Sequence, residues 1–176
     1  MEYKYFLALL QAGLYDACFA DMRTALVPFL DPAVYGRSTL ENCSFIASGA
    51  NPDVTTHGKG YIARLSGSSA EFISILLLML IGKTMFTQEN ELLFTLDPIL
   101  PGWLFDDNGE IVFHYLACTF CYHNPEKRNT YGENRANIVR MLVDGKSYAG
   151  SNMMRQPGMA KQLRDRELKR IDVYFI

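Results

Sequence analysis

The sequence predicts an α+β protein in which a helical part precedes a β part. Before Gly82 the apolar residues recur at helical spacing, whereas after it short apolar runs alternate with turn residues. The chain has 176 residues, of which 49% are hydrophobic and 20% are charged, so it has enough apolar material for a sizeable core. We expect two domains, residues 1–82 and residues 83–176.

Three helical segments are predicted in the first part. Apolar residues from Tyr5 to Phe29 follow helical spacing, with a break at Gly13 and an end at Pro28 and the Asp31-Pro32 pair. A capping-box pattern, Ser38-Thr39-Leu40-Glu41, predicts a short helix over residues 42–46. A second capping box, Ser68-Ser69-Ala70-Glu71, predicts a long helix with Ser68 as its N-cap and Gly82 as its stop.

The second part has the pattern of an antiparallel β-sandwich-like domain. Asp107-Asn108-Gly109 and Asp144-Gly145 are typical of hairpin turns. Residues 111–122 are apolar or aromatic on both faces, as in one strand buried inside a sandwich. The other expected strands are residues 92–96, 103–105, 138–143 and 171–176, and residues 151–166 are expected to be irregular.

The predicted helices are apolar around most of their circumference. Such helices must be buried on nearly every side, and two or three of them cannot bury one another fully. We therefore expect a piece of a larger helical domain with its following β-domain. An alternative is an incomplete gene product without an independent fold.

Composition excludes several classes of function. The net charge is −2, which does not favour nucleic acid or an anionic membrane as a partner. The longest apolar run, residues 72–81, is far shorter than the roughly 20 residues of a membrane span. Residues 1–4 do not resemble a signal peptide, and the four cysteines lack disulfide spacing, so we expect a reduced, cytoplasmic protein. Cys118 and Cys121 would point to opposite faces of a strand, so no metal is expected.

The turn before the long helix is a candidate anion site. Backbone N–H groups of Ser66, Gly67 and Ser68 would face one spot at the positive end of the helix dipole. Basic groups lie close upstream in His57, Lys59 and Arg64. The alternative is a plain helix start, where serine and glycine are favoured anyway.

Other candidate residues have ordinary alternatives. Arg37, Glu41 and Asn42 could offer a guanidinium, a carboxylate and an amide to a polyhydroxylated ligand, or could belong to a solvent loop with a helix cap. Trp103 could stack on a sugar or pack beside the Pro-Gly turn. For His114 and His123, the favoured interpretation is a solvated loop.

Several segments, taken in order, resemble the C-terminal part of bacterial and algal glycoside phosphorylases. These are relatives of cellobiose and chitobiose phosphorylase (glycoside hydrolase family 94), including the β-1,3-oligoglucan phosphorylases. The resemblance covers nearly the whole chain and implies the terminal helices of an (α/α)6 barrel followed by a β-domain. The segments that carry it are residues 35–38, 41–46, 57–58, 64–72, 98–105 and 122–125.

The resemblance implies inverting phosphorolysis, in which phosphate attacks the anomeric carbon while a carboxylic acid protonates the leaving oxygen. Ser66 and Gly67 match the family's phosphate-binding turn, and His57 is the candidate for its phosphate-binding histidine. Inorganic phosphate would be the co-substrate, with no other cofactor, and the glucosyl donor would be a β-linked gluco-oligosaccharide.

The general acid of that family lies well upstream of the phosphate turn, and the 65 residues before Ser66 are too few to include it, so Asp16, Asp21 and Asp31 are not assigned to that role. We therefore expect a fragment that is inactive alone, completed by the missing part of the barrel or by a homo-oligomer. The alternative is a non-catalytic carbohydrate-binding or interaction protein of the same scaffold.

Overall fold

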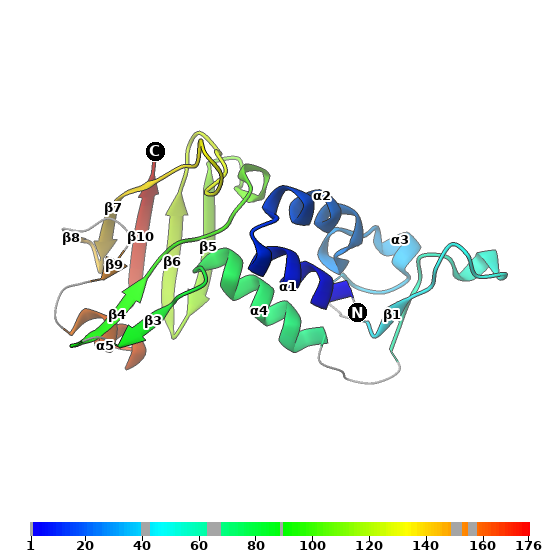
Figure 1. Cartoon of the computed structure of the whole chain (residues 1–176), viewed down its shortest axis with the longest axis horizontal. Helices are drawn as coiled ribbons and strands as arrows, with labels where there is room; N and C mark the ends of the chain where they lie inside the picture. Colours follow the sequence, from blue (N-terminus) through cyan, green and yellow to red (C-terminus); the bar gives the residue numbers. More distant parts are fainter. Residues whose placement is uncertain (1, 40–42, 63–67, 89, 149–152, 155–157) are drawn as a thin grey trace. The chain divides into compact units, whose positions relative to one another are not determined.

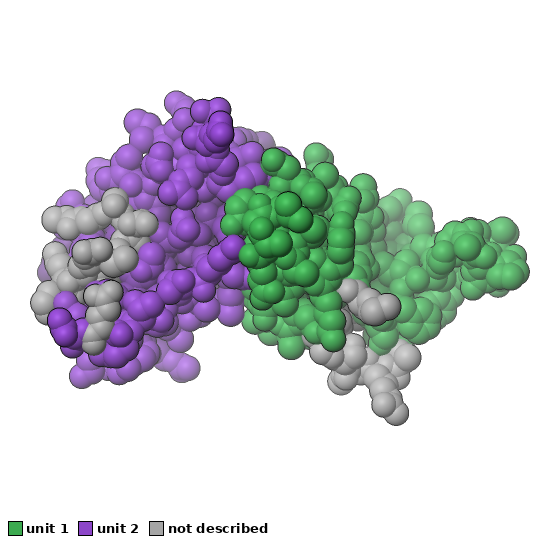
Figure 2. Space-filling model, in the orientation of Figure 1, with its two compact units in different colours: residues 1–76 green, residues 77–176 purple. Residues whose placement is uncertain are grey.

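The computed structural model describes residues 2–39, 43–62, 68–88, 90–148, 153–154 and 158–176. The chain divides into two compact units, residues 1–76 (unit 1) and residues 77–176 (unit 2), coloured separately in Figure 2. Helices and strands occur in the order expected for an α+β protein, so this fold class is confirmed. The assignment of residues 1–82 to a barrel and residues 83–176 to a sandwich-like domain stays a prediction.

Unit 1 begins with two helices, α1 (Glu2–Ala12) and α2 (Tyr15–Ala25), shown in Figure 1. They bury Phe6, Leu10 and Met22, and Gly13 separates them with a φ of 81°, as the sequence predicts. A 3-10 turn follows (η1, Val27–Phe29), and then a short helix α3 (Pro32–Tyr35). The Asp31-Pro32 pair therefore starts a helix rather than ending one, because the Asp31 carboxylate accepts the Ala33 N–H at 2.9 Å.

A two-stranded ribbon follows where a helix over residues 42–46 is predicted, and that prediction is wrong. β1 (Phe45–Ile46) pairs antiparallel with β2 (Gly60–Tyr61), and a 3-10 turn η2 (Val54–Thr56) lies between them. Phe45 lies directly opposite Tyr61, and the two rings stack at 5.4 Å. A cross-strand aromatic pair of this kind stabilises a ribbon, which explains why the local capping pattern does not decide this segment.

The predicted long helix is confirmed as α4 (Ser68–Leu80). Gly82 follows it with a φ of 116°, and a Cβ there would lie 2.6 Å from the Asp97 carbonyl oxygen. Among the described helices, none has the length and apolar character needed to cross a membrane.

Unit 2 contains a five-stranded sheet in the order β5-β6-β10-β7-β8 (Figure 1). Its strands are β5 (Glu110–Tyr115), β6 (Cys118–His123), β7 (Ile138–Val143), β8 (Lys146–Tyr148) and β10 (Arg170–Phe175). The last strand lies in the middle, antiparallel to β7 but parallel to β6, so the sheet is mixed and not antiparallel throughout. A second sheet has the order β3 (Phe86–Gln88), β4 (Leu92–Thr95) and β9 (Met153–Met154).

Three local predictions for this unit are wrong. Residues 111–122 form two strands rather than one, because the chain turns at Leu116 and Ala117 with φ angles of 49° and 63°. The Asp107-Asn108-Gly109 turn follows a 3-10 helix, η3 (Gly102–Leu104), instead of joining two strands. Residues 159–164, expected to be irregular, form helix α5 (Met159–Arg164). The Asp144-Gly145 hairpin between β7 and β8 is confirmed.

One face of the five-stranded sheet supplies the core of unit 2. Phe120, Tyr122 and Val173 are fully buried there, and Phe94 of β4 contacts Phe120 at 6.2 Å between ring centroids. The Tyr122 hydroxyl donates a hydrogen bond to the Leu80 carbonyl at the end of α4. Because side chains alternate along a strand, the residues between these apolar ones face the other side.

Candidate functional site

Part of the predicted phosphate and sugar site lies outside the described residues. Arg64, Ser66, Gly67, Glu41 and Asn42 belong to this group. Ser68 is the first residue of α4, so the predicted anion turn leads directly into a helix of 13 residues.

His57 lies in a loop that its own ring stabilises. Its Nε2 atom is 2.7 Å from the Asn51 carbonyl oxygen. The Asp53 carboxylate accepts hydrogen bonds from the Thr55 backbone and hydroxyl, and these bonds lower the pKa of Asp53. The histidine is thereby held in a defined place close to Lys59, which is exposed.

The segment that carries His57 packs against the segment that carries Arg37. A Cβ at Gly58 would lie 2.7 Å from Cγ1 of Val34, and a Cβ at Gly60 would lie 2.1 Å from Cε2 of Tyr35. Both glycines are therefore required for this close approach. Tyr35 is buried, which raises the pKa of its hydroxyl, and Arg37 follows it in a half-buried position. The structure thus brings together two of the segments that the sequence singles out.

Next to this contact lies a pocket of about 440 Å³ within unit 1. Tyr35, Ile46 and Gly58 line it together with Leu30, Asp31 and Thr24. The stacked pair Phe45 and Tyr61 lies on the adjoining ribbon, with exposed fractions of 53% and 36%. A mostly apolar hollow with a few polar groups is typical of a small-molecule site.

A second candidate lies on the outer face of the five-stranded sheet in unit 2. Alternate positions of four strands carry polar or ionisable side chains, which we call the polar face: Glu110, His114, Thr119, Cys121, His123, Arg140, Arg170, Asp172 and Tyr174. The register places Glu110 opposite His123 and Asp172 opposite Cys121.

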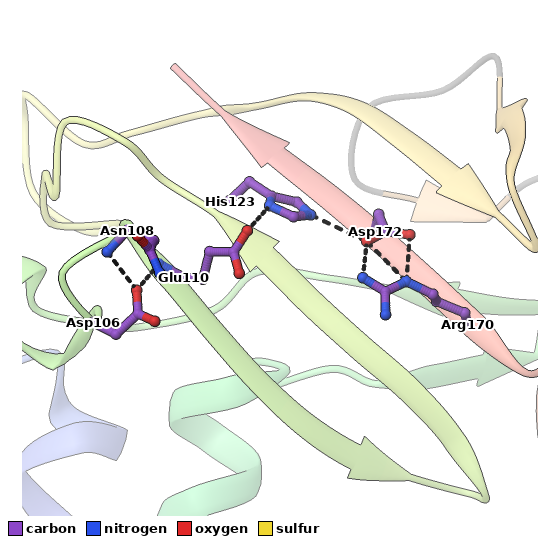
Figure 3. Close-up of polar contacts among 6 residues, drawn as sticks. All are labelled: Asp106, Asn108, Glu110, His123, Arg170 and Asp172. Atoms are coloured by element: carbon purple, nitrogen blue, oxygen red, sulfur yellow. Dashed lines mark hydrogen bonds and ion pairs between the residues drawn. The ribbon is translucent and has the colours of Figure 1, made fainter.

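His123, the last residue of β6, lies between two carboxylates of the polar face, as Figure 3 shows. Its Nδ1 atom is 2.8 Å from Oε1 of Glu110, and its Nε2 atom is 3.1 Å from Oδ1 of Asp172. The Arg170 guanidinium donates to both oxygens of Asp172, at 2.7 Å to Oδ1 and 2.9 Å to Oδ2. This charge-assisted pair lowers the pKa of Asp172 and raises that of Arg170.

Neighbouring groups also orient Glu110 and His123. Asp106 accepts the backbone N–H groups of Asn108 and Glu110, at 2.9 and 2.7 Å, which orients the start of β5. The His123 ring stacks on Tyr174 at 4.5 Å, and Arg140 lies over the same tyrosine at 4.0 Å from its centroid. The cluster is therefore ordered by hydrogen bonds and by stacking.

Sequence reasoning missed this cluster. The sequence predicts His123 beside a solvated turn and Cys121 as a core cysteine, and Cys121 is buried but lies on the polar face. The alternation of polar and apolar residues in Arg170-Ile171-Asp172-Val173-Tyr174-Phe175 was the available signal, because it predicts a strand with one polar face.

Comparison with known proteins assigns no family, since neither a family model nor a curated protein sequence matches the chain. Chemically, unit 1 offers a mostly apolar pocket whose polar lining residues include Glu2, Asp31 and Thr24. The polar face of unit 2 offers carboxylates, an imidazole and a thiol within reach of one another.

Proposed function

We propose that this chain binds β-linked gluco-oligosaccharides in unit 1, as the C-terminal part of a glycoside phosphorylase that is inactive alone. The observation that carries the proposal is the packing of residues 58–60 against residues 34–36 beside the pocket. This packing gathers the segments of Arg37 and His57, for which the resemblance implies sugar and phosphate contacts.

The start of α4 supports phosphate as the second ligand. Ser66 and Gly67 directly precede a helix of 13 residues, and the first turn of such a helix has unpaired N–H groups that favour an anion. Lys59 and Arg37 would add positive charge. In a phosphorylase these donors hold the nucleophile in line with the glycosidic bond.

Exposed apolar side chains support the assignment of residues 1–82 to the last helices of an (α/α)6 barrel, with residues 83–176 as the β-domain. Leu14 and Ile73 are 56% and 57% exposed although they lie at or within helices, and Tyr5, Phe29 and Leu76 are exposed as well. Apolar helix surfaces of this kind suit further helices, supplied by the rest of a barrel or by a second copy.

The roles of the nearby aspartates support inactivity in isolation. Asp21 accepts a hydrogen bond from the Tyr5 hydroxyl, and Asp31 caps α3. Each carboxylate thus already has a structural role, as a hydrogen-bond acceptor or as a helix cap.

The exposed Phe45–Tyr61 pair favours a second candidate, a non-catalytic carbohydrate-binding protein of the same scaffold. Stacked aromatic side chains present flat apolar area to a sugar ring at little cost in conformational entropy.

A phosphorolysis assay on laminari- and cello-oligosaccharides tests the first proposal. We expect little or no glucose 1-phosphate from this chain alone. Robust turnover would contradict the proposal that the chain is a fragment that is inactive alone. Calorimetric titration with the same sugars then separates the two candidates. Binding that strengthens with inorganic phosphate supports the phosphorylase part, binding indifferent to phosphate supports the binding protein, and the absence of sugar binding contradicts both.

A further inference from the structure

The polar face of unit 2 holds three different metal-ligating groups close together. One ligand atom each from Glu110, Cys121 and His123 lies within 4.8 Å of the others. The three residues come from two adjacent strands, with Glu110 opposite His123 and Cys121 two residues before it on the same face. The backbone of an antiparallel pair therefore fixes their spacing.

Each ring nitrogen of His123 faces a carboxylate oxygen, Oε1 of Glu110 or Oδ1 of Asp172. An ionised carboxylate only accepts hydrogen bonds, so each contact is made either through a hydrogen on the ring nitrogen or through a metal ion that replaces it. A metal ion between Nδ1, Oε1 of Glu110 and the Cys121 sulfur would replace one of these hydrogens. The other, on Nε2, would stay with Asp172.

We propose that Glu110, Cys121 and His123 bind a zinc ion or a similar divalent transition metal. A thiolate and an imidazole favour zinc over calcium or magnesium, and the charges of a thiolate and a carboxylate balance those of a divalent ion. Ligand atoms in a tetrahedral zinc site lie roughly 3.4 Å apart, so closure needs side-chain shifts of about an ångström. Three protein ligands leave a fourth position for water or a small ligand.

Asp172 and Arg170 flank the proposed ligands, and the Arg170 guanidinium interacts with Cys121 as well as with Asp172. A histidine that ligates a metal through one nitrogen usually donates its other N–H to a carboxylate, which fixes the ring and its tautomer. Asp172 accepts from Nε2 at 3.1 Å and is itself held by Arg170. Asp172 is thus a positioning residue, and the metal site is independent of the proposed function of unit 1.

Binding releases protons, because the Cys121 thiol must lose its hydrogen and the hydrogen between His123 and Glu110 must leave. Both pass to the solvent or the buffer. The chain is not oxidised or reduced.

Cobalt(II) and zinc(II) titrations of the chelator-treated full chain test the site. We expect one metal per chain, a thiolate-to-cobalt charge-transfer band, and displacement of cobalt by zinc. Cys121→Ser should abolish the band, and Glu110→Gln should weaken binding at least tenfold. Asp172→Asn should weaken binding by about 10–100-fold while leaving the band in place.

His114→Asn is the matched control, because His114 lies on the same face but bonds Thr119 instead. It should leave affinity and spectrum unchanged. A cobalt spectrum without a thiolate band, or equal affinity in the wild type and Glu110→Gln, would overturn the proposal. Glu110 is 38% exposed at its side chain, so Glu110→Gln serves as the test even if Cys121→Ser fails to fold.

Discussion

Nε2 of His123 lies 3.1 Å from Oδ1 of Asp172, across the parallel strands β6 and β10. The two residues are 49 positions apart in the sequence. Since Asp172 also accepts three hydrogen bonds from Arg170, it joins the histidine to a fixed guanidinium. This polar cluster of unit 2 therefore depends on the central position of the last strand.

Asp172 should make the free energy of unfolding depend on pH. Its pKa is lowered by Arg170 first and by His123 second, so its stabilising effect is present above the ordinary value of 3.8 and is lost as pH falls through the lower native value. Asp172→Asn should lower the free energy of unfolding by about 1–3 kcal/mol at neutral pH. In urea unfolding the difference from wild type should shrink as the pH falls below 3.8. A difference that stays constant with pH would argue against this role.

Tyr122→Phe should destabilise unit 2 by about 1 kcal/mol, because it leaves the Leu80 carbonyl without the hydroxyl that donates to it. Thermal or urea unfolding measures the loss. Tyr115→Phe on the neighbouring strand β5 is the control and should cost less, since Tyr115 is only half-buried. Equal losses in the two variants would show that the hydrogen bond contributes nothing specific.

Gly102→Ala should be strongly destabilising, by about 1–3 kcal/mol or more, because its Cβ would lie 1.7 Å from the Lys127 carbonyl oxygen. Gly49→Ala is the matched control, since no heavy atom lies within 4 Å of a Cβ there. That control should be neutral or slightly stabilising. A Gly102→Ala protein with the wild-type melting temperature would refute the close approach.

The cysteines should resist labelling in the native protein. All four are buried, and burial raises the pKa values of Cys18 and Cys118 to about 11. Few thiolates are then available at neutral pH. A disulfide-exchange reagent should react with these two only after denaturant is added, and fast reaction of both without denaturant would contradict their burial.

The sequence predicts local elements better than long-range pairing. Gly13 and Gly82 mark helix limits correctly because a break acts within one turn of the chain, and the helix predicted to have Ser68 as its N-cap begins at Ser68 itself. The turn at residues 116–117 is not predicted, because Leu and Ala rarely adopt a positive φ. Only the pairing of β5 with β6 accounts for this turn.

The polar cluster of unit 2 likewise depends on long-range pairing that the sequence does not predict. His123, Glu110 and Asp172 are brought together by strand register, and no spacing rule relates positions that are 13 and 49 residues apart. Likewise, the capping box before residue 42 favours a helix, yet Phe45 pairs with Tyr61 in a ribbon. The packing of residues 58–60 against residues 34–36 requires two glycines whose purpose only the tertiary contact reveals.

Calorimetric titration of Tyr61→Ala with laminari-oligosaccharide, with inorganic phosphate present, tests the proposed sugar site most directly. The wild type should bind, and the variant should bind at least several-fold more weakly, because it loses one of the two exposed stacked rings on the β1–β2 ribbon. Ile73→Ala, an exposed apolar change on α4, should bind as the wild type does. Equal affinity of Tyr61→Ala and wild type, or no binding by either, would contradict carbohydrate binding in unit 1.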